Sequence, residues 1–154
     1  MSNTDVNALE LDTTLNGAGM RDALVVMYNK LVYWTQQHSE WDQKKKKLEN
    51  LLTEAQDKAR AIKAKEAGAT GMKAKIQESH IKDFWDVSLS LVDTDSGEIK
   101  DVTCSFLNSE LIVATQNESR TRHNMNLCTT ALDIGRTCVS WDKSELSMIG
   151  ASHG

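Results

Sequence analysis

Histidine, cysteine and acidic side chains are the groups in this chain that can bind metals or act as acids, bases and nucleophiles. The four histidines, His38, His80, His123 and His153, show no metal-binding spacing with one another or with the cysteines. His123 and Cys128 are five positions apart, which places them on different faces of a helix. Nothing orders the serines, histidines and aspartates into a catalytic triad. The sequence therefore predicts no metal site, no catalytic residue and no enzyme.

Two glycine-containing segments match ligand-binding loops only in part. In the segment 93–98 (DTDSGE) the glycine comes one position too early for a calcium loop, and no bidentate glutamate follows at the required distance. This segment predicts a turn. The segment 68–71 (GATG) lacks the Lys-Ser/Thr ending and the preceding strand of a phosphate-binding loop. No cofactor is therefore expected.

Composition narrows the class of protein further. The net charge of −4 argues against nucleic acid as the main partner. No stretch approaches the roughly 20 apolar residues that span a bilayer, and the N-terminus lacks the basic and apolar regions of a cleavable secretory signal. Cys104, Cys128 and Cys138 have no motif spacing, which favours free thiols made in a reducing compartment over a disulfide.

The strongest pattern is a 4-3 spacing of apolar residues over residues 24–62 and 107–149. A sustained heptad means that each helix needs a partner helix along its length. The chain contains no proline, whereas average usage would give about seven or eight, so long uninterrupted helices are expected. The apolar seam that we expect to drive assembly consists of Leu24, Met27, Leu31, Trp34, Trp41, Leu48, Leu52, Leu111, Met125, Leu132, Val139, Leu146 and Ile149.

Polar residues interrupt both halves of this seam. His38 and Lys45 break the first half, and Glu118, Thr121 and Asp142 break the second. An ammonium at the position of Lys45 costs stability but can fix register or oligomeric state.

These patterns predict a mainly α fold with two long antiparallel coiled-coil helices and a small α/β-hairpin insertion between them. We expect a flexible polar tail over residues 1–19, helices over 20–66 and 106–150, and an outer insertion over 67–105. The polar composition of residues 1–17 fits either a frayed tail or an uncleaved export signal, and it does not choose between them.

The insertion has its own pattern. A short amphipathic helix is expected over 72–84, followed by strands over 85–91 and 98–104 that pair as a hairpin. A lone hairpin is marginal in water, so it should rest on a helix, with the 72–84 helix as one candidate.

The nearly equal lengths of the two long helices suggest a register in which facing residue numbers add to about 173. Gly135 would then lie beside Trp34 and His38 and make room for their rings. The alternative is that Gly135 is a tolerated helix defect that costs about 1 kcal/mol.

Three motifs carry a resemblance to a known family. They are residues 23–28 (ALVVMY), 126–131 (NLCTTA) and 144–150 (SELSMIG). With the two long helices, they resemble the EspA-type filament proteins of bacterial type III secretion systems. In that family the N- and C-terminal helices form a coiled coil that packs helically around a narrow channel, and the middle of the chain faces outward. The resemblance implies a secreted structural protein that has no active site and needs a cytosolic chaperone before export.

The leading hypothesis is therefore a subunit that self-assembles into a hollow extracellular filament and conveys unfolded protein cargo. It would be made in the cytosol and form a homo-oligomeric helical polymer at the bacterial surface, with an export chaperone and secretion needle or tip proteins as partners. Val25, Val32 and Tyr33 are expected to bind neighbouring subunits. The alternatives are a bacteriophage virion protein (tail, neck or ejection component) and a cytosolic coiled-coil adaptor or chaperone.

Overall fold

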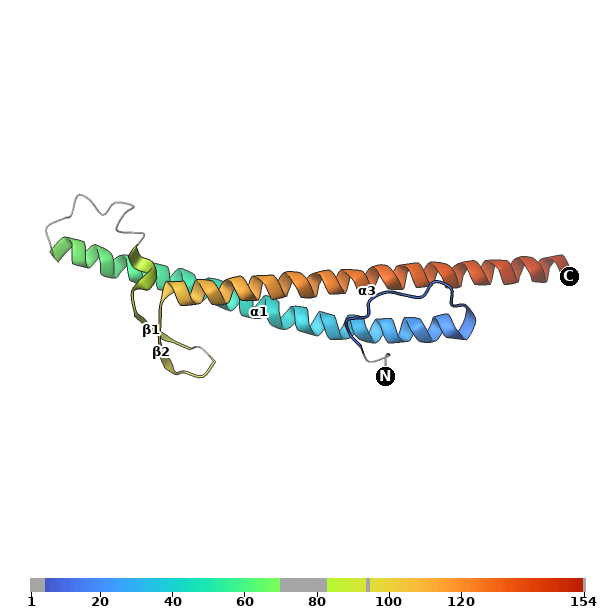
Figure 1. The fold of residues 1–154 in the computed structure, drawn as a ribbon, viewed down its shortest axis with the longest axis horizontal. Coiled ribbons are helices and arrows are strands. Elements are labelled where there is room, and N and C mark those ends of the chain that lie inside the picture. Colours follow the sequence, from blue (N-terminus) through green and yellow to red (C-terminus); the bar gives the residue numbers. More distant parts are fainter. Residues whose placement is uncertain (1–4, 70–82, 94, 154) are drawn as a thin grey trace. The chain divides into compact units, whose positions relative to one another are not determined.

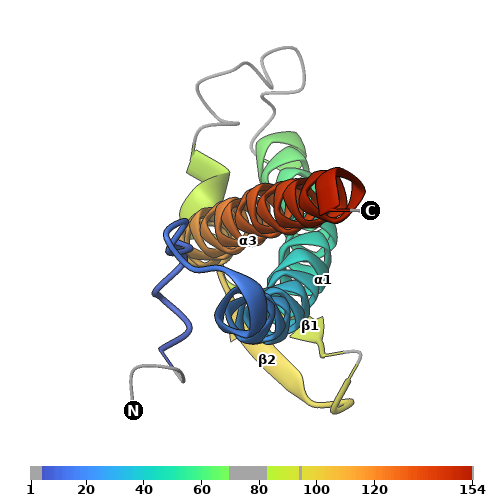
Figure 2. The ribbon, with the colours of Figure 1, turned by 90° about the vertical axis from the view of Figure 1, so that its right-hand side faces the viewer.

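The computed structural model is mainly helical and describes residues 5–69, 83–93 and 95–153. The side chains of residues 67–69, 83 and 140–153 are not described. In chain order the elements are α1 (Gly17–Ala69), the 3₁₀ helix η3 (Asp83–Asp86), β1 (Leu89–Val92), β2 (Ile99–Val102) and α3 (Cys104–His153). Figures 1 and 2 show the long helices α1 and α3 running alongside each other, with the hairpin between them in the sequence. The predicted fold class is confirmed.

The chain divides into two compact units, each with its own hydrophobic core. Unit 1 comprises residues 1–40 and 117–154, and unit 2 comprises residues 41–116. Each unit contains one stretch of α1 and one stretch of α3, so the two long helices contribute to both cores.

Both helices extend slightly further than the pattern predicted. The carbonyl of Asn16 accepts the first hydrogen bond of α1, from the amide of Met20 at 3.3 Å. At the start of α3, Thr103 is the N-cap: its Oγ1 accepts a hydrogen bond from the amide of Phe106 at 3.1 Å. The heptad pattern predicted that this helix begins at 106, whereas it begins at Cys104. The N-cap residue is polar, so the apolar pattern does not include it.

The hairpin forms over shorter strands than predicted. β1 and β2 pair antiparallel, with Leu89 opposite Val102 and Val92 opposite Ile99. In the turn, the amide of Gly97, whose φ is +71°, donates to the carbonyl of Asp93 at 2.7 Å. Glycine adopts this left-handed conformation without steric cost.

The inner face of β1 packs on the long helices. Leu89 and Leu91 are buried in the unit 2 core, whereas the alternate residues Ser90 and Val92 are exposed. The same core contains Leu48 and Leu52 of α1 and Leu107 of α3. The expected short helix over 72–84 lies mostly outside the described residues.

The two helices are antiparallel within unit 1, but their predicted register is wrong. His38 lies opposite Glu118, and Leu24 lies opposite Gly135. The numbers of facing residues therefore add to about 156 to 159, not to about 173. Gly135 does make room for a large side chain, but that side chain is Leu24 and not Trp34. Equal helix lengths were a poor guide because the hairpin folds back along α1 in unit 2, where Lys47 reaches Asp93.

Candidate assembly surfaces

The apolar seam expected from the heptads packs inside the chain. In unit 1, Met27, Trp34 and Leu132 are buried, and Leu24, Leu31 and Met125 pack against them. In unit 2, Leu48 and Leu52 are buried, with Trp41 and Leu111 packed against the same core. Val139 is half-buried, and the side chains of Leu146 and Ile149 lie outside the described residues. At the described positions, most of this seam is therefore already covered by the chain itself.

One polar break from each half of the seam meets the other in unit 1. Nε2 of His38 lies 3.2 Å from Oε1 of Glu118, whose side chain is only 7% exposed. Nη1 of Arg122, one helical turn further along α3, lies 3.6 Å from the same oxygen. The buried hydroxyl of Thr121 donates to the carbonyls of Asn117 and Glu118. The sequence showed His38, Glu118 and Thr121 as interruptions of the seam, but it could not show that His38 and Glu118 are partners.

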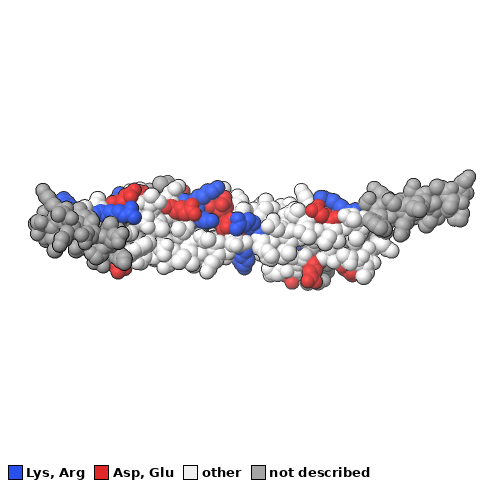
Figure 3. All heavy atoms as spheres, turned by 90° about the horizontal axis from the view of Figure 1, so that it is seen from above, with Lys and Arg blue, Asp and Glu red and all other residues white. Residues whose placement is uncertain are grey.

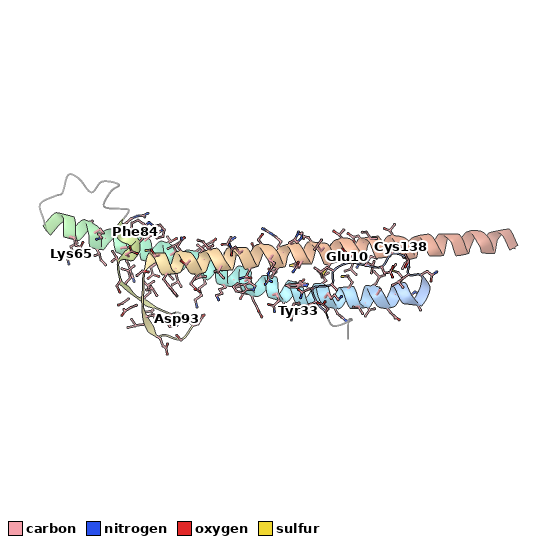
Figure 4. All side chains as sticks on the ribbon, in the orientation of Figure 1. Glu10, Tyr33, Lys65, Phe84, Asp93 and Cys138 are labelled. Carbon is pink, nitrogen blue, oxygen red and sulfur yellow. The ribbon has the colours of Figure 1, made fainter. Side chains whose placement is uncertain are left out.

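Residues 5–16, which we call the N-terminal strap, pack along unit 1. Val6, Leu9 and Leu11 contact its core. Nζ of Lys30 donates to the carbonyl of Ala8 at 2.7 Å, and Nε1 of Trp34 donates to the carbonyl of Val6 at 2.7 Å. Figures 1 and 4 show the strap crossing from α1 to α3, with Glu10 labelled beside α3. Its composition suggests a flexible tail, but its three apolar side chains and two carbonyls have partners in the structure.

One face of α1 in unit 1 carries exposed apolar side chains. Val25 is 61% exposed, Tyr28 54% and Val32 43%. Their spacing of three and four residues places them on one side of the helix, and we call this set the α1 stripe. Tyr33, which is labelled in Figure 4, is also exposed and packs edge-on against Trp34. Val25, Val32 and Tyr33 are therefore exposed, and their binding to neighbouring subunits stays a prediction.

An apolar hollow adjoins the α1 stripe. It has a volume of about 250 Å³ and is lined by Leu24, Val25, Tyr28, Leu132 and Arg136. On α3, Leu127 and Ile134 are exposed as well and lie seven residues apart, on one side of that helix. We call these two residues the α3 stripe. Unit 1 therefore carries exposed apolar side chains on both α1 and α3, outside its own core.

Unit 2 has a groove between the hairpin and the long helices. Its volume is about 300 Å³, and Leu51, Leu91 and Phe106 are among its apolar lining residues. Lys47 at its edge forms hydrogen bonds with Asp93, at 3.2 Å, and with Asp95. Asp93, labelled in Figure 4, also accepts a hydrogen bond from the amide of Asp95.

The charged groups beside this groove shift one another's pKa values. The hydrogen bond from the Asp95 amide, followed by that from Lys47, holds the pKa of Asp93 below its ordinary value. The carboxylates of Asp95 and Asp93 raise the pKa of Lys47. The ion pairs therefore tie the hairpin turn to α1.

The three cysteines are free thiols in different surroundings. Cys104 is buried in the unit 2 core and Cys128 in the unit 1 core. Burial raises the pKa of both thiols, because the thiolate would lose its hydration. Cys138, labelled in Figure 4, is half-buried.

Metal-ligating clusters and membrane-spanning helices are both absent from the part of the chain that the structure describes. Among the side chains of residues 5–66, 84–93 and 95–139, no group of three or more His, Cys, Asp and Glu is placed to hold a metal ion. Over the same residues, neither long helix has a segment with the length and apolarity that crossing a membrane requires. On the face in Figure 3, acidic and basic side chains lie beside one another between uncharged areas.

Comparisons with protein-family models, with curated proteins and with solved structures found no match to this chain.

Proposed function

We propose that this protein is a structural subunit that self-assembles into a helical, hollow extracellular secretion filament and conveys unfolded protein cargo. The observation that carries the proposal is the α1 stripe. Val25, Tyr28 and Val32 remain exposed after the seam has been buried inside the chain. Side chains of this size contribute about 1.5–3 kcal/mol each when they are fully buried. A contact with a neighbouring copy would recover part of this free energy.

The exposed surfaces fit contacts in which different surfaces of neighbouring copies meet. The α1 stripe and the α3 stripe lie on different helices and consist of different residues. When one surface of a subunit binds a different surface of the next, the contact is heterologous. Such contacts form either closed rings or open helical filaments.

The resemblance to EspA-type filament proteins supports the secretion filament as the specific form of this polymer. Under the proposal, the protein is made in the cytosol with an export chaperone and is then secreted. It then meets secretion needle or tip proteins at the bacterial surface. The closed ring of a phage virion component and the small oligomer of a cytosolic adaptor are the competing forms.

The test has to separate assembly from folding. Leu31 and Leu132 belong to the unit 1 core, so an aspartate at either position is expected to unfold the subunit. Val25→Asp and Val32→Asp instead place a charge on the exposed α1 stripe and should leave the helices intact by circular dichroism. Ser119→Asp, at an exposed polar position of α3 in the same unit, is the matched control.

Negative-stain electron microscopy of the concentrated full chain gives the result. We expect open-ended hollow tubes from the natural chain and from Ser119→Asp, and no tubes from Val25→Asp or Val32→Asp. Closed rings would favour the virion component, and small discrete oligomers without export of the tagged protein would favour the adaptor. Tubes from both stripe variants would contradict the role of the α1 stripe.

A further inference from the structure

We propose that the N-terminal strap is exchanged between copies, so that the strap of one subunit binds the strap-binding surface of another. This surface, which we call the unit 1 groove, contacts residues 5–16 and includes Lys30, Trp34 and Gly135. The inference concerns the partner of this groove, and it rests on the proposed self-assembly. The occupant is known from the structure itself, because the groove already holds residues 5–16 of its own chain.

The groove contacts are of a kind that any copy of the strap can satisfy. Both hydrogen-bond donors, Nζ of Lys30 and Nε1 of Trp34, belong to α1, and both acceptors are strap carbonyls. Lys30 is 8% exposed and Trp34 is 4% exposed. A buried polar group without a partner costs free energy. The groove therefore requires an occupant with carbonyls at these positions, but nothing in these contacts requires it to come from the same chain.

The shape of the groove suits the strap sequence. A Cβ atom added at Gly135 would lie 2.8 Å from Cδ2 of Leu11, as well as 2.3 Å from Cδ2 of Leu24. Leu11 therefore packs over a position that has room for it only because residue 135 is a glycine. This fit makes a second copy of the strap a better occupant than an unrelated apolar peptide.

The hydrogen bonds within the strap would be kept when the strap binds another copy. Its two turns are local: the amide of Ala8 donates to the carbonyl of Asp5, and the amide of Leu15 donates to the carbonyl of Asp12. The carboxylate of Asp12 also accepts hydrogen bonds from Thr14. These interactions remain whichever copy supplies the groove.

The junction between the strap and α1 is suited to a change of direction. Gly17 has a φ of +50° and Gly19 follows two residues later. A Cβ atom at Gly17 would meet no atom within 4 Å, so the chain is not confined there. Exchange of an identical element between copies retains its contacts and is a low-cost route to association. Assembly through the α1 and α3 stripes would bring neighbouring straps and grooves together at high effective concentration.

The test uses full-length chains that carry a photo-crosslinking phenylalanine analogue at Leu9, in the strap. This chain is made with natural nitrogen and mixed, while dilute, with an equal amount of probe-free chain labelled with ¹⁵N. The mixture is concentrated, irradiated and analysed by mass spectrometry for crosslinks to α1 or α3. A second chain with the probe at Val6 guards against displacement of the strap by one bulky substitution. A chain with the probe at Thr13, which is exposed, is the matched control.

Exchange predicts light–heavy and light–light crosslinks in about equal amounts in the concentrated sample, because a light strap then meets light and heavy grooves equally often. In the dilute sample only light–light crosslinks are expected, and Thr13 should give few of either kind. If filaments form but the probes at Leu9 and Val6 both give light–light crosslinks and no light–heavy ones, the exchange proposal is overturned. The filament proposal is then unaffected. Light–heavy crosslinks in small discrete oligomers would support the exchange and contradict the filament.

Discussion

Nε2 of His38 on α1 lies 3.2 Å from Oε1 of Glu118 on α3, so one polar break in each half of the apolar seam is the partner of the other. A buried carboxylate is costly unless it has hydrogen-bonding or charged partners. If α1 slid along α3 by one turn, Glu118 would lose His38 and face apolar side chains. The pair therefore selects the observed register from others that the heptads alone would allow.

The His38–Glu118 pair should show energetic coupling in a double-mutant cycle. Glu118→Ala is expected to lower the free energy of unfolding by about 2 kcal/mol, because it leaves His38 without its carboxylate partner. The coupling between His38→Ala and Glu118→Ala should be about 1 kcal/mol, measured by urea denaturation at neutral pH. Additive effects of the two single substitutions would show that the pair does not select the register.

Gly135 should tolerate no added side chain. In Gly135→Ala, the new Cβ would lie only 2.3 Å from Cδ2 of Leu24 and 2.8 Å from Cδ2 of Leu11. Both leucine side chains therefore have to move away. Overpacking of this kind costs about 1–3 kcal/mol, which outweighs the gain of about 1 kcal/mol in helix propensity. Thermal denaturation should therefore show a lower midpoint.

Gly19→Ala provides the matched control for this substitution. A Cβ atom at Gly19 would lie 3.7 Å from Cδ2 of Leu15, which is an ordinary contact. This variant should be as stable as the natural chain or slightly more stable. A Gly135→Ala variant of equal or greater stability would contradict the close approach of Leu24.

The hairpin should be held to α1 only within a window of pH. The pKa of Asp93 is lowered from 3.8, so its contribution to stability is present above pH 3.8 and is lost as the pH falls through the folded-state pKa. The pKa of Lys47 is raised from 10.5, so its contribution is present below pH 10.5 and is lost as the pH rises through the folded-state pKa. Both contributions are modest because the groups are solvated.

The measurement compares the natural chain with Lys47→Met by hydrogen exchange of the β1 and β2 amides. The natural chain should be better protected at intermediate pH, and the difference should vanish in strong acid and strong base. Lys46→Met, which removes an exposed pair with Asp42 on the same helix, should leave the hairpin unchanged. A difference that persists in strong acid would show that Asp93 is not the partner that matters.

The three thiols should differ in reactivity. Cys104 and Cys128 are 0% exposed, and burial raises the pKa of both, which lowers the thiolate fraction that reacts. Iodoacetamide should therefore modify Cys138 first in the folded protein, as followed by peptide mapping. In denaturant the three rates should become similar. Modification of Cys104 or Cys128 as fast as that of Cys138 in the folded protein would contradict the two cores.

Helical periodicity was enough to predict the fold class. The seam residues from Leu24 to Leu52 and from Leu111 to Leu132 do face the interior, because apolar side chains at heptad spacing are buried together whichever helix they meet. The alternation around Leu89 and Leu91, followed by turn residues, was likewise enough to predict the hairpin.

The register and the free surfaces could not be predicted in the same way. The register depends on single contacts, such as His38 with Glu118 and Leu24 over Gly135, which leave no mark on the periodicity. The strap was missed because its polar composition hides three spaced apolar residues, Val6, Leu9 and Leu11. The spacing of Val25, Tyr28 and Val32 was a usable signal, but it identifies a second apolar face only once the first face is known to be buried.

The most direct test is whether copies associate through the α1 stripe and the α3 stripe. Sedimentation velocity of the natural chain, over an approximately hundredfold range of concentration, measures this. The natural chain should form species that grow continuously with concentration, as an open-ended heterologous contact requires, and the Val25→Asp variant should sediment as a folded monomer throughout. A single monomeric boundary for the natural chain at every concentration would contradict this association.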